Sequence, residues 1–135
     1  MYLLDSNIFL ELLLDQDGAD DVEKLLRSVP GERLNISEFS LYSVGIVLFR
    51  RKLFDVFVQF VEDIIITGGV RLLRLSAEEA KALAKVAERF KLDFDDAYQY
   101  AIAERYGLTI VSFDTDFDRT ERGRKTPGDL LKGEK

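Results

Sequence analysis

The sequence predicts a three-layer α/β/α fold, in which helices cover both faces of a mainly parallel central sheet of four or five strands. Short apolar segments alternate along the chain with longer segments whose apolar residues recur every three or four positions, the spacing of one helix face. Strands that alternate with helices in this way are joined by crossovers and become parallel neighbours. At 135 residues and 47% apolar content, the chain is expected to form one domain, residues 1–135.

The first half of the chain contains two short predicted strands, Tyr2-Leu3-Leu4 and Leu34-Asn35-Ile36. A polar turn around Gly18 separates the first two helical segments, and Pro30-Gly31 ends the second. Gly68-Gly69 ends the fourth. The four helical segments cover residues 9–14, 22–28, from a cap at Ser37 to about Arg50, and 54–64.

The second half contains two further strands, at residues 70–75 and 109–112. Ser76 and Glu79 have the spacing of a capping box and predict the start of a helix that buries residues between 80 and 90. Asp93 is expected to cap the next helix, which ends at Gly107. From about residue 119 the chain is a polar, basic tail, with room for a short element near Leu130.

Histidine and cysteine are both absent from the sequence. Their absence excludes an imidazole base, a Ser-His-Asp triad, thiolate chemistry and disulfides. The net charge of −6 argues against a broadly basic surface for nucleic acid. No apolar segment is long enough to cross a membrane, and Asp5 and Glu11 interrupt any signal-peptide core. We therefore expect a cytoplasmic protein with no membrane partner.

Acidic residues follow three of the four predicted strands. Asp5 comes directly after the first strand, Glu38 comes just after the second, and Asp114 comes just after the fourth, with Asp116 two residues on. Ligands of parallel α/β sheets bind at the carboxyl ends of the strands, so these side chains are expected on one rim. The helix before the fourth strand should begin at the same rim, and its acidic residues are Asp93, Asp95 and Asp96.

Carboxylates that converge repel one another unless a cation neutralises them. Hard divalent ions such as Mg²⁺ and Mn²⁺ prefer oxygen ligands and can hold a water and a phosphodiester for in-line attack. The pattern therefore favours metal-assisted phosphoryl hydrolysis. Each acid also has a structural interpretation, because carboxylates stabilise the first turn of a helix or cap a surface turn. From the residues alone, both interpretations stay open.

Two segments resemble the PIN-domain family of nucleases. The segment from Leu3 to Asn7 is similar to the opening of that domain, in which a strand ends in Asp followed by Ser or Thr and Asn. The segment from Asp96 to Phe117 is similar to its second half, in which an Asp-Ala helix leads through a glycine to a strand and a further Asp. The resemblance implies a ribonuclease dependent on Mg²⁺ or Mn²⁺, with an RNA substrate. Many such domains are VapC-type toxins with an antitoxin partner, and homodimers are common among them.

The resemblance also assigns roles to individual residues. Asp5, Asp96 and Asp114 match three of the family's acids, and the catalytic role is carried over to these three. Asp116 matches an additional acid, and Ser112 matches a hydroxyl that orients a water or a metal ligand. Ser6 and Asn7 complete the first motif as supporting residues.

The second family acid has no direct counterpart. The best alignment places Ser43 where the family has a glutamate, and Glu38 is the nearest acid, about one helical turn earlier. Either Glu38 joins the metal ligands from the start of the helix, or the site works with one acid fewer. This departure supports a second hypothesis, a non-catalytic PIN-like module that binds RNA or protein.

Two further interpretations come from the residues. A basic cluster in the tail suggests contacts with the RNA backbone, although a solvated tail is the simpler explanation. The cluster comprises Arg119, Arg122, Arg124 and Lys125. A receiver domain of the response-regulator type also gathers Asp residues at strand ends, but it needs a phosphoacceptor Asp after its third strand. Here that strand leads into Ser76, which disfavours a receiver.

Overall fold

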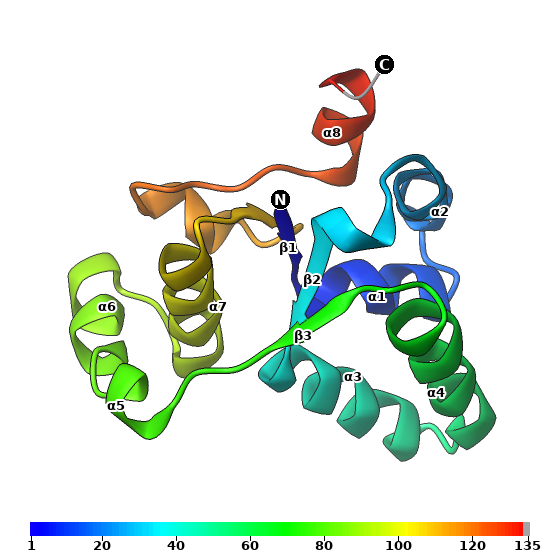
Figure 1. Cartoon of the computed structure of the whole chain (residues 1–135), viewed down its shortest axis with the longest axis horizontal. Coiled ribbons are helices and arrows are strands. Elements are labelled where there is room, and N and C mark those ends of the chain that lie inside the picture. The colour runs from blue at the N-terminus through cyan, green and yellow to red at the C-terminus, as the bar shows by residue number, and fades with distance from the viewer. Residues whose placement is uncertain (134–135) are drawn as a thin grey trace.

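In the computed structural model, which describes residues 1–133, helices lie on both sides of a four-stranded sheet (Figure 1). The strand order is β3-β2-β1-β4, and every neighbouring pair is parallel. This arrangement confirms the predicted three-layer fold with a parallel sheet. The strands are β1 (Tyr2–Leu4), β2 (Leu34–Ser37), β3 (Arg71–Leu73) and β4 (Thr109–Val111).

A single bridge extends the sheet beyond β4. The backbone of Lys125 pairs with β4 in parallel, with its N–H donating to the Ile110 carbonyl at 2.8 Å and its carbonyl accepting from the Ser112 N–H at 3.0 Å. Within residues 1–133, a fifth strand is therefore present only as this one bridge.

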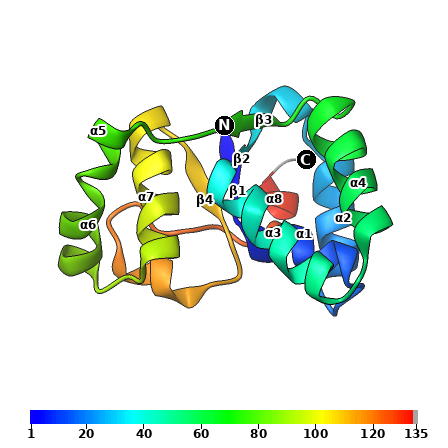
Figure 2. The same cartoon turned by 90° about the horizontal axis from the view of Figure 1, so that it is seen from below.

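Helices connect the strands and form the outer layers. Helices α5, α6 and α7 lie on one side of the sheet, and α1 to α4 lie on the other (Figures 1 and 2). The α-helices are α1 (Ser6–Leu13), α2 (Ala19–Ser28), α3 (Glu38–Arg50), α4 (Phe54–Phe60), α5 (Ala77–Ala80), α6 (Leu83–Phe90), α7 (Phe94–Tyr106) and α8 (Pro127–Gly133). The short elements are the 3₁₀ turns η1 (Gly31–Arg33) and η3 (Thr115–Arg119) and the π-helical turn η2 (Val61–Ile66). No helix in residues 1–133 is both long and apolar enough to cross a membrane.

The two faces of the sheet belong to two apolar cores. Successive side chains of a strand point to opposite faces, so Leu4 and Val111 pack into the core beneath α1 to α4, whereas Leu3 and Ile110 pack into the core beneath α6 and α7. All four side chains are essentially inaccessible to solvent. A sheet of three- and four-residue strands is thus covered on both faces, as a parallel sheet requires.

Several predicted boundaries differ from the structure for local reasons. Helix α2 begins at Ala19, earlier than predicted, because the Glu11 carboxylate accepts a hydrogen bond from the Gly18 N–H at the start of the helix. The third strand is shorter than predicted, because the Val70 N–H donates to a carbonyl at the end of the preceding helix and the Leu75 N–H donates to the Tyr98 hydroxyl.

Two predicted helices are divided. The capping box of Ser76 and Glu79 forms as predicted, but the helix that it starts ends at Ala80. The next N–H groups bond three residues back and tighten the turn before α6 begins. The predicted 54–64 helix becomes η2 after Phe60.

The tail is more ordered than the sequence indicated. Thr120, Pro127 and Leu130 are buried, and α8 packs against α2. The short element expected near Leu130 is therefore a helix that completes one of the two outer layers.

Candidate metal centre

Three carboxylates meet at the carboxyl edge of the sheet. Asp96, Asp114 and Asp116 each offer an oxygen within 4.8 Å of the other two. Asp96 lies in the first turn of α7, which begins at this edge because it crosses back before β4. Asp114 lies just beyond β4 and caps η3, and Asp116 lies within η3. The structure thus brings three predicted acids from two separate segments into reach of one ion.

Local hydrogen bonds set the direction of the two acids after β4. Asp114 caps η3, and its Oδ1 accepts from the Asp116 N–H at 2.8 Å. The Asp114 N–H in turn donates to the Ser112 Oγ at 2.9 Å. The turn after β4 is therefore folded around its own carboxylate, which explains why the Asp-x-Asp spacing keeps both acids at the same rim.

Asp5 lies beside this group and is linked to it through Ser112. The Asp5 side chain is buried, with 7% of its surface exposed, and its Oδ2 accepts from the Ser112 Oγ at 2.7 Å. Its Oδ1 accepts from the Ser6 N–H at 2.9 Å. Asn7 donates to the Ser112 Oγ at 3.1 Å and accepts from the Phe113 N–H at 3.3 Å. Ser112 is the hub that joins the end of β1 to the end of β4.

Burial and like charge raise the pKa values of the central acids. Loss of hydration, followed by the charges of Asp114, Asp95 and Asp5, raises the pKa of Asp96 to about 8. A first-turn position would by itself favour the ionised form, so these effects outweigh the helix dipole. Burial also raises the pKa of Asp5, against the hydrogen bonds from Gln99, Ser112 and Ser6.

Such a group of carboxylates fits a divalent cation. Its ligand atoms are hard oxygens, and their mutual repulsion is relieved by a positive charge between them. The chemistry of these residues therefore matches Mg²⁺ or Mn²⁺.

Arg119 is the predicted basic residue that comes nearest to the acids. Its Nη1 forms an ion pair with the Asp116 Oδ1 at 3.0 Å. Its other nitrogens donate to the carbonyls of Phe90 and Lys91 at the end of α6. Arg119 therefore fastens the turn carrying Asp116 to a neighbouring helix.

The other basic residues of the tail are also engaged in the fold, apart from the Lys125 side chain, which is exposed. Arg122 donates to the Leu108 carbonyl at 3.0 Å. Arg124 donates to the Ser112 carbonyl at 3.1 Å and forms an ion pair with Asp118 at 3.1 Å. These contacts give the arginines a structural role whether or not they also contact RNA.

Glu38, the acid on α3 that was expected to join the metal ligands, is not part of the three-carboxylate group. Among residues 1–133 that group contains Asp96, Asp114 and Asp116, and the Glu38 carboxylate instead accepts a hydrogen bond from the Tyr42 hydroxyl, which raises the pKa of Tyr42. Ser43 lies further along α3 and brings no charge. The second acid of similar domains therefore has no equivalent in the group.

Two uncharged helix residues that no sequence pattern singled out, Gln99 and Ser40, lie at the edge of the candidate site. The Gln99 Nε2 donates to the Asp5 Oδ1 at 2.9 Å and also to the Ser40 Oγ. Both side chains are buried. The available signal was a glutamine three residues after Asp96, on a part of α7 that is otherwise mostly buried and apolar.

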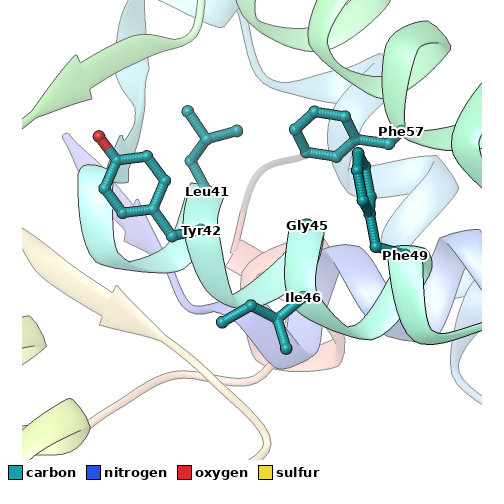
Figure 3. A pocket seen from close by; sticks show the side chains of 6 residues that line it. All are labelled: Leu41, Tyr42, Gly45, Ile46, Phe49 and Phe57. Atoms are coloured by element: carbon teal, nitrogen blue, oxygen red, sulfur yellow. The ribbon is translucent and has the colours of Figure 1, made fainter.

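A separate apolar hollow of about 340 Å³ lies between α3 and the middle of α4 (Figure 3). The Phe49 and Phe57 rings stand at one end of the hollow and Tyr42 at the other, with Gly45 between them. A Cβ on Gly45 would meet the Phe57 ring at 3.1 Å, so the missing side chain allows this close packing. The hollow is lined by Leu41, Tyr42, Gly45, Ile46, Phe49 and Phe57.

The family model described as the PIN domain matches residues 2–123. A comparison with curated protein sequences gave no match.

Several solved structures share the fold. A toxin–antitoxin complex from Klebsiella pneumoniae contains a chain with a TM-score of 0.75 and 21% identity, covering 94% of this chain and 98% of that one. VapC20 from Mycobacterium tuberculosis, described as a toxin that cleaves the sarcin–ricin loop, has a TM-score of 0.75 and 20% identity, covering 87% and 93%. FitAcB from Neisseria gonorrhoeae has a TM-score of 0.72 and 22% identity, covering 95% and 99%. At these identities the similarity is one of fold.

Proposed function

Because the chain belongs to the PIN domain family, we propose that it is a divalent-metal-dependent endoribonuclease that hydrolyses RNA phosphodiester bonds. The observation that carries the proposal is the meeting of Asp96, Asp114 and Asp116 within 4.8 Å at the carboxyl edge of the sheet. Asp5 lies beside them and shares Ser112 with the Asp114 backbone. RNA is favoured as the substrate by resemblance to similar domains.

Some residues of the chain would bind the metal, and others would position these ligands. Asp5, Asp96 and Asp114 are the proposed catalytic acids, and with Asp116 they would hold Mg²⁺ or Mn²⁺. Bound there, the ion would lower the pKa of a water and neutralise charge on the scissile phosphate. A carboxylate of the group can accept the proton that the water loses, so no other side-chain base is required. Ser112, with Ser6 and Asn7, keeps Asp5 directed toward the site.

The proposal predicts that Asp96→Asn abolishes cleavage while the fold is kept. Asparagine has nearly the same shape but carries no negative charge, so the ion loses a ligand in the most buried part of the group. Cleavage of a mixed-sequence fluorescent RNA would be followed with Mg²⁺, Mn²⁺ or EDTA, alongside circular dichroism of each variant. We expect wild type to cleave with either metal, EDTA to stop cleavage and Asp96→Asn to be inactive.

The matched control is Asp55→Asn, which removes one negative charge from the first turn of α4, outside the carboxylate group. It should cleave as wild type does. An Asp96→Asn protein with undiminished, EDTA-sensitive cleavage would remove Asp96 from the site.

The alternative function is a non-catalytic PIN-like module that binds RNA or protein. Ser43 at the position of the family glutamate and the pairing of Glu38 with Tyr42 favour it. Calorimetry with Mn²⁺ separates the two functions. A folded wild type that binds RNA but no Mn²⁺ would establish the module and end the nuclease proposal.

Two protein partners are also proposed. One structure of similar fold is described as a toxin–antitoxin complex, which supports an antitoxin partner for this chain. The test is expression in bacteria, where wild type should arrest growth and Asp96→Asn should not. Rescue by a small DNA-binding protein encoded beside the chain would identify the antitoxin. The second partner is another copy of the chain, and the hollow over α3 is the proposed contact.

A further inference from the structure

The Gln99 side chain connects three elements at the edge of the metal centre. It lies on α7, three residues after Asp96, and only 1% of its surface is exposed. Its Nε2 donates to the Asp5 Oδ1 at 2.9 Å, just beyond β1, and to the Ser40 Oγ on α3. The helix that carries Asp96 is thereby joined directly to the Asp5 carboxylate.

The orientation of the amide is determined by Asp5. Both N–H bonds of the Gln99 amide are used, whereas its Oε1 is buried with no hydrogen-bond partner in residues 1–133. The reversed amide would place Oε1 against the Asp5 Oδ1, so that two acceptors would face each other without a proton between them. An unpartnered buried carbonyl is unfavourable, so the contacts made by the N–H groups outweigh it.

The hydrogen bond from Gln99 joins Asp5 to α7, whereas the other two donors to Asp5 do not. The Ser6 N–H belongs to the residue next to Asp5, and Ser112 lies at the end of β4. Neither joins Asp5 to α7, so neither fixes its carboxylate relative to Asp96. A buried apolar side chain at position 99 would fill the same space without restraining Asp5.

We propose that Gln99 is a positioning residue of the metal centre, whose amide, anchored by Ser40, fixes the direction of the Asp5 carboxylate relative to Asp96. The inference rests on the proposed function of the site. Helix α3 supplies no acid to the three-carboxylate group, and it acts on the site through Ser40 and Gln99 instead. Hydrogen-bonding partners of metal ligands commonly change metal affinity by about 10–100-fold when they are removed.

The test is Mn²⁺ affinity measured by calorimetry for Gln99→Met, which keeps the size of the side chain and removes both N–H donors. We expect the dissociation constant to rise by about 10–100-fold. The Mn²⁺ concentration for half-maximal RNA cleavage should rise in parallel, with the rate largely restored at saturating Mn²⁺. Gln59→Met is the control, because Gln59 also donates from Nε2 to a carboxylate, that of Asp63 on the exposed surface. It should bind Mn²⁺ as wild type does.

Ser40→Ala gives a second and milder variant. Its backbone N–H still donates to the Ser37 Oγ, so the start of α3 is retained. We expect weaker Mn²⁺ binding than in wild type and, in the double variant, no further loss beyond that of Gln99→Met. Non-additivity of this kind identifies residues that act in series. If Gln99→Met does not fold, Ser40→Ala alone carries the test.

The possible outcomes separate this inference from the proposed function. If Gln99→Met folds and binds Mn²⁺ with wild-type affinity, the positioning role is overturned and the nuclease proposal is left intact. Where only Ser40→Ala folds, wild-type Mn²⁺ affinity in that variant has the same meaning. A wild type that binds Mn²⁺ but cleaves no RNA overturns the nuclease proposal, while the affinities still decide the role of Gln99. A wild type that binds no Mn²⁺ overturns both.

Discussion

Asp96 combines two properties that both disfavour its ionised form in the absence of metal. It is nearly buried, and Asp114, Asp95 and Asp5 surround it with like charge, so that its pKa rises from the ordinary value of 3.8 to about 8. In the unfolded chain it ionises near its ordinary value. Between about pH 4 and pH 8 the folded state therefore binds more protons than the unfolded state, and stability falls as pH rises.

We therefore predict that the metal-free protein loses thermal stability between pH 5 and pH 8. Asp96→Asn should flatten this dependence, because the neutral amide carries no charge to bury. Mn²⁺ should restore wild-type stability at pH 8, because binding to the folded state raises it. Differential scanning calorimetry in EDTA and in Mn²⁺ checks all three expectations. A metal-free melting temperature that rises through this range would contradict the assigned electrostatics.

Sequence patterns singled out the acidic residues of the candidate site better than the uncharged residues that hydrogen-bond to them. Asp5, Asp114 and Asp116 were found because strand ends and short spacings are visible in the sequence. Gln99 and Ser40 were missed because each is an ordinary helix residue, and their contact joins positions 59 residues apart in the chain. The local exception is Ser112, which the motif identified and which proved to be a hydrogen-bonding hub.

The segment from η3 to α8 contains both basic side chains that stabilise the fold and basic side chains that remain free to contact a ligand. Arg124 is largely buried against the Ser112 carbonyl and Asp118, whereas Lys125 contributes backbone hydrogen bonds and leaves its ammonium group exposed. Substitution of the two residues should therefore have different effects.

We predict that Arg124→Ala lowers the melting temperature, because the Ser112 carbonyl loses its guanidinium donor. Lys125→Ala should leave it unchanged. If the tail contacts the RNA backbone, Lys125→Ala should also reduce the slope of log Kd against log salt by about one. RNA binding over a range of salt concentrations, with thermal melts of both variants, provides the measurement. An unchanged slope would assign the basic tail to the fold alone.

At the scale of elements, sequence patterns located the four strands and the helices from α1 to α7, but not all of their ends. Helix α3 was predicted with its correct limits, because Ser37 is a capping residue whose hydroxyl accepts from the Ser40 N–H. The split after Ala80 and the π-helical turn after Phe60 were not predicted, since both depend on the backbone partner chosen within a continuous apolar pattern.

Considered as a whole, the molecule has an exposed apolar surface over α3 and the start of α4. Tyr42, Ile46, Phe49 and Phe54 are each about half exposed, at 58%, 52%, 52% and 49%. Phe49 and Phe54 also contact each other edge to face, with ring centroids 4.9 Å apart. Clustered apolar side chains of this kind mark interaction surfaces.

The corresponding prediction is that the chain forms a homodimer through this surface and that Phe49→Glu makes it monomeric. A carboxylate there would be buried without a partner in the dimer. Val58→Glu, which charges an exposed residue on α4 outside the hollow, should remain dimeric. Light scattering after size-exclusion chromatography gives the masses. A wild type that is monomeric at high concentration would refute the contact.

The overall architecture was predictable because crossover handedness and strand alternation leave few arrangements for such a chain. The strand order was not, because it depends on β1 and β4 becoming neighbours across more than 100 residues. Short strands contain too little local information to select their partners.

The central place of β1 has a consequence for synthesis. Of the four strands in the described sheet, β1 leaves the ribosome first, yet one of its two neighbours is β4, which leaves it last. The hydrogen bond between Ser112 and Asp5 spans 107 positions, a contact of very high sequence separation. Until β4 has emerged, the nascent chain has one side of β1 unpaired and Asp5 without its hub. Under the proposed function, a chain still being translated carries no assembled nuclease until β4 and the turn that follows it have emerged.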